Sequence, residues 1–153
     1  MTYKIVPYDP AYKQVFYDLN AQWLKEFFVI EPWDETVLSN PEKHVIDEGG
    51  EILFAVEEGK AIGVVAMKSE ENNRFELTKL AVDKSTRKGG IGRALCQAVI
   101  ERYKIRGGDT LFLETNTVLG NAIRLYEKLG FIEQSNPAQS SYERSDYYME
   151  WRK

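Results

Sequence analysis

The stretch that decides the fold reads Val82-Asp83-Lys84-Ser85-Thr86-Arg87-Lys88-Gly89-Gly90-Ile91-Gly92-Arg93-Ala94. A strand pattern over 75–82 precedes it, and a helix pattern over 91–103 follows it. A glycine-rich turn with basic side chains therefore leads a strand into the N-terminus of a helix. The first amides of a helix have no partner within it and carry a partial positive charge, so this turn predicts a phosphate-binding site.

Two well-known phosphate-binding loops fit this turn poorly. A Walker A loop ends in Gly-Lys-Ser/Thr, but Gly92 is followed by Arg93. A dinucleotide-binding loop has a third glycine where Leu95 stands, and a shorter gap after its strand. Glu114 falls near the place of a ribose-binding acid and keeps that alternative open. The turn alone fits a structural strand–helix connection equally well.

The composition is that of a globular protein, and we expect one domain over residues 1–153. Hydrophobic residues make up 43% of the chain, and a formal net charge of -4 argues against general nucleic-acid binding. One cysteine and one histidine give neither a disulfide nor a His/Cys metal site. With no secretory signal and no apolar run long enough for a bilayer, the sequence predicts a cytoplasmic protein without a metal.

Hydrophobic periodicity predicts strands over 3–8, 52–57, 61–68, 74–82, 110–115, 131–134 and 147–151. It predicts helices over 11–28, 35–39, 91–103 and 121–129, with Asp34 as N-cap of the second and an apolar loop over 29–33 before it. Short turns make the three middle strands an antiparallel meander, and the segment 74–115 is a β-α-β unit with parallel strands. We therefore expect an α/β fold with a mixed, twisted sheet of six to seven strands and helices on both faces.

Two motifs together resemble the GCN5-related N-acetyltransferase (GNAT) family. The family's acetyl-CoA motif, Gln/Arg-x-x-Gly-x-Gly/Ala after a strand, is matched by Arg87-Lys88-Gly89-Gly90-Ile91-Gly92 after Leu80-Ala81-Val82. A second hallmark, Ala-x-x-Leu-Tyr-x-x-x-Gly-Phe, is matched by Ala122-Ile123-Arg124-Leu125-Tyr126-Glu127-Lys128-Leu129-Gly130-Phe131. A helix and an apolar strand separate the motifs, and the resemblance covers most of the chain.

The resemblance implies acetyl-CoA as the acyl donor and a GNAT-like fold. In the family the strand end pairs with the pantetheine arm and the glycine turn holds the pyrophosphate. This implies cofactor binding by Leu80, Ala81, Val82, Arg87, Lys88, Gly89, Gly90, Ile91, Gly92, Arg93 and Tyr126. The chain departs from the pattern at two places: Lys88 replaces a frequent glycine, and Leu119 a frequent asparagine. Asn116 or Asn121, which flank Leu119, is then expected to contact the cofactor.

The resemblance also implies direct attack of an amine on the thioester, so Cys96 is expected to pack in the core rather than act as a nucleophile. Tyr126 is the candidate proton donor to the departing thiol, and a packing role is the alternative. Glu114 and Glu76 compete as general base, with Glu114 slightly ahead, and water chains often serve this family instead.

The acceptor amine is expected between the first helix–loop–helix and the last hairpin. Phe28, Glu31 and Trp33 offer an aromatic wall with one carboxylate, although core packing explains them equally well. Tyr142 and Arg144 stand in a polar segment before the last strand. There the planar fork of Arg144 is expected to hold a substrate carboxylate, with an ordinary surface arginine as the alternative.

The sequence thus predicts an enzyme that moves an acetyl group from acetyl-CoA to a primary amine of a small-molecule or amino-acid-like acceptor. Two alternatives stay open: a protein N-terminal or lysine acetyltransferase, and an acyl-CoA-binding sensor without turnover. The lack of a basic docking segment favours a small acceptor. Neither nucleic acid nor a membrane is an expected partner, and the chain is expected to be a monomer or a homodimer.

Overall fold

The computed structural model describes residues 3–86 and 89–152. Seven strands form one sheet in the order β1-β2-β3-β4-β5-β7-β6. They are β1 (Tyr3–Pro7), β2 (Glu51–Glu57), β3 (Lys60–Glu70), β4 (Arg74–Val82), β5 (Thr110–Thr115), β6 (Phe131–Glu133) and β7 (Tyr147–Trp151). β4 and β5 pair in parallel, whereas the other neighbours pair antiparallel. The predicted mixed sheet is confirmed, with seven strands.

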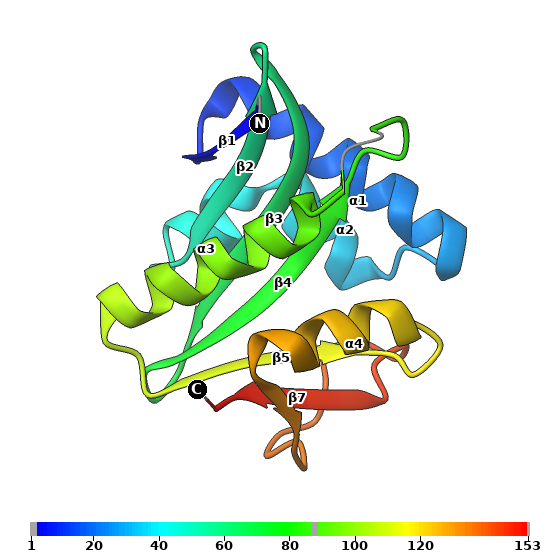
Figure 1. Cartoon of the computed structure of the whole chain (residues 1–153). Helices are drawn as coiled ribbons and strands as arrows, with labels where there is room; N and C mark the ends of the chain where they lie inside the picture. The colour runs from blue at the N-terminus through cyan, green and yellow to red at the C-terminus, as the bar shows by residue number, and fades with distance from the viewer. Residues whose placement is uncertain (1–2, 87–88, 153) are drawn as a thin grey trace.

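Four α-helices cover the two faces of the sheet (Figure 1). They are α1 (Lys13–Phe27), α2 (Pro32–Ser39), α3 (Ile91–Arg106) and α4 (Gly120–Leu129). A short 3-10 helix, η1 (Pro10–Tyr12), precedes α1, and a short π-helix, η2 (Glu42–Ile46), follows α2. In Figure 1, α3 and α4 lie in front of the sheet, and α1 and α2 lie behind it. Among the described residues, none of the helices has the length and apolar character that a membrane crossing requires.

Each face has its own hydrophobic core. Leu95, Cys96 and Val99 of α3 pack on the front face of the sheet. Phe16 of α1 and Val37 of α2 pack on its back face. All five side chains are fully buried. Burial of one such aliphatic or aromatic side chain stabilises a fold by about 1.5–3 kcal/mol, so the two cores fix the sheet between its helix layers. Cys96 lies in the core, as predicted.

The helix α2 begins three residues earlier than the sequence predicts. Pro32 takes the first helical position, where its missing N–H is no loss, and Glu31 is the N-cap. The Asp34 carboxylate accepts the backbone N–H of Glu31 at 2.9 Å, so Asp34 lies inside the first turn. The prediction of Asp34 as N-cap was wrong, and the predicted loop over 29–33 ends at Glu31, because the prediction gave too little weight to proline at N1.

A β-bulge near the end of β4 changes which side chains face which helices. Thr78 pairs with Ala66 and Ala81 with Val64, so Lys79 and Leu80 lie opposite a single residue of β3. Lys79 has a φ of 58°, in the left-handed region that costs a non-glycine residue about 1 kcal/mol. The simple alternation of a strand is therefore broken at this point.

The faces of β4 exchange across this bulge. Before it, Phe75 and Leu77 belong to the front core. After it, Leu80 and Val82 pack on the front core, and Ala81 packs on the back core. A period-two pattern cannot show such an exchange, because every second residue of β4 is buried along its whole length.

The parallel strands β4 and β5 separate soon after they begin. Their pairing covers Arg74 to Glu76 on β4 and Thr110 to Phe112 on β5, and then stops. β5 stays paired on its other side, with β7, as far as Thr115. The two strands therefore diverge toward their C-terminal ends (Figure 1), and we call the place beyond their last paired residues the opening between β4 and β5.

Candidate active site

A pocket occupies the opening between β4 and β5, and its walls come from both faces of the sheet. Leu119, Ala122 and Tyr126, from α4 and the segment before it, line it on the front. Trp23 and Phe28, from α1 and its C-cap, line it on the back. A ligand can therefore approach the same point from two directions.

The tyrosine of the second sequence motif lies on the front side of this pocket. Tyr126 is buried, with its ring edge-on to Phe131 at a centroid distance of 6.0 Å. Burial raises the pKa of the Tyr126 hydroxyl above its ordinary value, and the nearby Cys96 adds a smaller effect in the same direction. No described residue makes a hydrogen bond to this hydroxyl, so it stays protonated and free to donate to a bound group.

Two carboxylates lie on neighbouring strands at the back of the pocket. Glu76 pairs with Phe112, two residues before Glu114, so Glu76 and Glu114 project from the same face of the sheet. Burial, and next the charge of Glu114, raise the pKa of Glu76 to about 7. A base with a pKa near neutrality is well matched to proton abstraction. The arrangement therefore favours Glu76 over Glu114, the reverse of the order predicted from the sequence.

Glu114 is held in a different way. Its carboxylate accepts hydrogen bonds from Asn136 at 2.8 Å and from Ser140 at 2.7 Å. Both donors come from the loop between β6 and β7, residues 134–146, which we call the β6–β7 loop. The hydrogen bonds fix the position of the Glu114 side chain and tie the loop to the end of β5.

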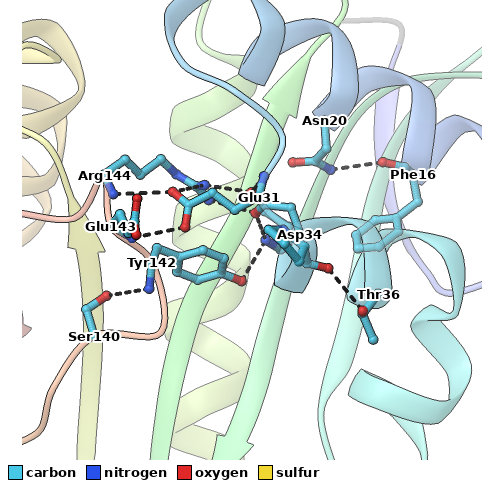
Figure 2. Close-up of polar contacts among 11 residues, drawn as sticks. Phe16, Asn20, Glu31, Asp34, Thr36, Ser140, Tyr142, Glu143 and Arg144 are labelled. Atoms are coloured by element: carbon cyan, nitrogen blue, oxygen red, sulfur yellow. Dashed lines mark hydrogen bonds and ion pairs between the residues drawn. The ribbon is translucent and has the colours of Figure 1, made fainter.

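A buried ion-pair network closes the back of the pocket. The Asp34 carboxylate accepts from Lys79 Nζ at 2.9 Å and from the guanidinium of Arg144 at 2.6 and 2.8 Å. Lys79 Nζ also donates to the Tyr142 hydroxyl at 2.9 Å, and Arg144 lies 3.3 Å from a Glu31 carboxylate oxygen. Figure 2 shows Tyr142 and Arg144 extending from the β6–β7 loop toward Glu31 and Asp34. The network thus joins α2, the bulge of β4 and the β6–β7 loop.

Asp34 is the centre of this network. Its side chain is fully buried. Burial alone would raise the pKa of Asp34, but the hydrogen bonds from Arg144 and the charge of Lys79 outweigh it and hold the pKa below its ordinary value. The sequence pattern indicates no functional role for Asp34 or Lys79. Nothing in the local pattern separates Lys79 from an ordinary strand lysine, because its position depends on the bulge.

The structure brings some of the predicted acceptor residues to the pocket and leaves others outside. Phe28, Tyr142 and Arg144 line it. Glu31 and Trp33 do not: Glu31 caps α2, and the Trp33 ring packs edge-on against His44 with Lys68 above it.

The prediction for Arg144 needs a correction. Its planar fork, expected to be open for a substrate carboxylate, closes on Asp34 in a bidentate contact. Arg144 therefore has a carboxylate partner within the protein.

The predicted cofactor residues lie along the strand end and the glycine turn. Leu80 lines the pocket, whereas Ala81 and Val82 stay paired with β3. Asn116 lines the pocket; Asn121 is exposed and paired with Arg124. Arg87 and Lys88 lie outside the described residues.

The start of α3 is open to a ligand. Gly90 is the N-cap, with φ 84°, and no described side chain caps the helix. A Cβ added at Gly89, Gly90 or Gly92 would meet nothing within 4 Å. The side chain of Ile91 is buried, so Ile91 offers only its backbone, and Arg93 is exposed. The free amides of this first turn form an anion-binding surface.

Comparison with known proteins settles the family. The profile of the Acetyltransferase (GNAT) family matches residues 13–131. The chain belongs to this family. An N-acetyltransferase of Bacillus subtilis, YvbK, is 31% identical over 104 residues, which are 66% of this chain and 67% of that protein. An N-acetylaspartate synthetase of Xenopus tropicalis is 37% identical over 98 residues, 63% of this chain; the chain spans only 36% of the length of that synthetase.

Solved structures share the GNAT fold along the whole chain. A GNAT-family acetyltransferase of Staphylococcus aureus superimposes with a TM-score of 0.86 at 23% identity, covering 97% of this chain and 98% of its own. The PaiA N-acetyltransferase of Thermoplasma acidophilum, solved in complex with coenzyme A, superimposes with a TM-score of 0.79 at 17% identity, covering both chains fully. These structures therefore have the same overall fold as this chain.

Proposed function

We propose that the chain is an N-acetyltransferase that moves an acetyl group from acetyl-CoA to the primary amine of a small acceptor. The observation that carries this proposal is the pairing of two groups in one pocket. Glu76, whose pKa is near 7, lies at the back of the opening, and the protonated Tyr126 lies at its front. Amide formation from a thioester needs both functions: an amine that loses a proton and a sulfur that gains one.

The residues of the chain fit acetyl-CoA. The uncapped first turn of α3 suits a pyrophosphate, because its amides are free and its glycines leave room for close approach. Leu80 and Asn116 line the pocket, and we expect them to contact the arm of the cofactor. Support also comes from the PaiA structure, which contains coenzyme A. When bound, acetyl-CoA supplies the acetyl group in an activated, thioester form.

Each residue then has a defined task. Glu76 accepts the proton that the acceptor ammonium loses, and Glu114 keeps the pKa of Glu76 high through its charge. Tyr126 donates its hydroxyl proton to the sulfur that departs. The bulge of β4 takes Lys79 and Leu80 out of the regular pairing with β3, and we propose that a backbone N–H near Leu80 stabilises the developing negative charge on the carbonyl oxygen.

The acceptor we propose is a small amine or an amino-acid-like compound, used in the cytoplasm by one domain spanning residues 1–153. The name of the Xenopus relative refers to a small molecule, which supports a small acceptor over a protein. A protein acceptor, at an N-terminus or a lysine, is the second candidate. It is favoured by the exposed apolar residues Phe27 and Val29 beside the pocket-lining Phe28.

A screen of amines tests the proposal. Release of free coenzyme A is followed for wild-type protein with acetyl-CoA and a panel of small amines, amino acids and peptides with free N-termini. Acceptor-dependent release above the rate of hydrolysis is expected with at least one small amine. Release with peptides alone would favour the protein acceptor. Tight acetyl-CoA binding without release for any compound would identify a sensor and contradict the proposal.

A further inference from the structure

The charges that line the acceptor side of the pocket are not balanced, and their imbalance selects a class of substrate. This inference rests on the proposed acetyl transfer and narrows its acceptor. Two cations and two carboxylates line this side: Lys79, Arg144, Glu76 and Glu114. Which of them already has a partner of opposite charge decides what the pocket will bind.

Both cations are neutralised within the protein. Lys79 Nζ contacts Asp34 Oδ1 at 2.9 Å, and Arg144 contacts both oxygens of the same carboxylate at 2.6 and 2.8 Å. Glu31 adds a second negative charge, 3.3 Å from Arg144 Nη1. Two carboxylates thus match two cations. A substrate carboxylate would have to compete with Asp34, which is fully buried and cannot be released to water without moving α2.

Neither pocket carboxylate has a cation within ion-pair distance among the described residues. Glu114 is held by the neutral donors Asn136 and Ser140. No described residue donates a hydrogen bond to Glu76. The charge of Glu114, and a Glu76 carboxyl group that loses its proton near neutral pH, therefore face the space where the acceptor must lie with no described cation paired to either. An entering cation stabilises the ionised form of both.

A third cation, Lys68, does not pair with either pocket carboxylate. Lys68 lies across from Glu76 on β3, but its Nζ is 3.8 Å from Glu70 and 5.2 Å from the centroid of the Trp33 ring. Its charge lowers the pKa of Glu76, but burial and the charge of Glu114 outweigh it, and Lys68 forms no ion pair with Glu76. Aromatic side chains complete the wall of the pocket, with Trp23 and Phe28 from α1 beside Tyr142. Such rings favour an organic cation over an anion.

We propose that the acceptor is a small primary amine bound as its ammonium between Glu76 and Glu114, and that a carboxylate next to the amino group is rejected. In the transfer, the ammonium gives one proton to Glu76 and the amine nitrogen bonds to the acetyl carbon. The carbon–sulfur bond breaks, and the sulfur takes a proton from Tyr126. The nitrogen then releases its second proton to the Tyr126 phenolate, which restores the hydroxyl and leaves a neutral amide. An α-carboxylate would meet the same two glutamates and no unmatched cation.

Matched pairs of acceptors test this selection. The kcat/KM of wild-type protein is measured with 2-phenylethylamine against phenylalanine, tyramine against tyrosine, and propylamine against 2-aminobutanoate. Phenylalanine amide serves as a control, because it keeps the size of phenylalanine and removes its negative charge. Each amine is expected to exceed its amino acid by at least tenfold, the amide is expected to recover most of the loss, and aspartate, with two carboxylates, is expected to be the poorest acceptor.

A pair of variants links the selection to the pocket. Glu114→Gln is expected to raise KM for the amines roughly tenfold and to reduce the discrimination against amino acids, because one of the two charges is gone. Glu127→Gln, an exposed glutamate of α4 outside the pocket, should change neither. Amino acids that react as well as their amines, or aspartate as the best acceptor, would overturn the inference and leave the acetyltransferase intact. No acetylated product from any compound would overturn the proposed function, and this inference with it.

Discussion

The environment of Glu76 favours its chemistry and lowers the stability of the fold. Its carboxyl group is desolvated and lies beside a second carboxylate, so it holds a proton that an exposed glutamate would lose. The same environment gives it the proton affinity that a base needs near neutral pH. A residue of this kind is useful for chemistry and unfavourable for stability, and both effects can be measured on one variant.

The first prediction concerns Glu76→Gln. The pKa of Glu76 is raised from 4.5 to about 7, so the folded protein keeps a proton that the unfolded chain has lost. Stability therefore falls as pH rises between these values and is constant above them. The variant removes this penalty. We expect it to be more stable than wild type by about 1–3 kcal/mol at pH 8 in chemical denaturation, and about equal to wild type near pH 4.

The activity of Glu76→Gln should fall, although its stability rises. The wild-type rate is expected to rise with pH through about 7 and then to level, whereas Glu76→Gln should be slower by roughly two to four orders of magnitude, with no such rise. Glu101→Gln, an exposed glutamate of α3 outside the pocket, is the matched control. If Glu76→Gln kept the wild-type pH–rate profile, Glu114 or a water would take the role of base.

The second prediction concerns Tyr126→Phe. The ring stays in the front core, so acetyl-CoA affinity should change little, and only the hydroxyl is lost. We expect kcat to fall roughly tenfold to a thousandfold at unchanged KM for acetyl-CoA. Because burial raises the pKa of Tyr126, wild type should show no loss of the proton donor up to pH 10. Wild-type kcat in the variant would return Tyr126 to a packing role.

At the scale of elements, the Asp34 network is what holds the β6–β7 loop against α2. The sequence predicted the strands and helices around it closely: β4, β5 and β7 have the predicted bounds. It did not predict the network, because Asp34, Lys79 and Arg144 are far apart in the chain and meet only through the bulge of β4 and the start of α2 at Pro32. Glycines and apolar periodicity are visible in a sequence, but the partners of a buried charge are not.

The third prediction concerns this network. Asp34→Asn leaves Lys79 and Arg144 buried without their shared carboxylate, and we expect a loss of about 3–5 kcal/mol in denaturant unfolding. The pKa of Asp34 is lowered in the folded protein, so its contribution is present above the ordinary carboxyl pKa and disappears as pH falls through the lowered value. Glu35→Gln, on an exposed position of the same helix, should change the stability little. Equal stability of the two variants would contradict a central role for Asp34.

The fourth prediction concerns the first turn of α3. Acetyl-CoA at a hundred times its dissociation constant should stabilise wild type by about 2.7 kcal/mol, seen as a rise in melting temperature. Gly90→Glu places a negative side chain where the pyrophosphate belongs and should abolish the rise. Gly59→Glu is the matched control, since Gly59 also has a positive φ and open surroundings, but lies in the β2–β3 turn. An unchanged rise in Gly90→Glu would place the cofactor elsewhere.

At the scale of the whole molecule, the order of elements and the mixed sheet follow from the sequence, because periodicity and short turns leave few ways to connect the strands. The opening between β4 and β5 does not follow from it. Thr110 to Thr115 reads as one apolar strand, and only the register shows that its pairing with β4 ends at Phe112. The candidate site therefore required both the motifs around Gly90 and Tyr126 and the divergence of two strands.

The most direct test of the account is the fate of the acetyl group. Wild-type protein is incubated with 2-phenylethylamine and acetyl-CoA labelled with a heavy isotope in the acetyl group, and the masses of both products are measured. We expect one labelled acetyl group on each converted amine, in equal amount to the coenzyme A released, and almost none with Glu76→Gln. Coenzyme A released without label on any amine, or the label found on the protein alone, would contradict direct transfer from acetyl-CoA to an amine in this pocket.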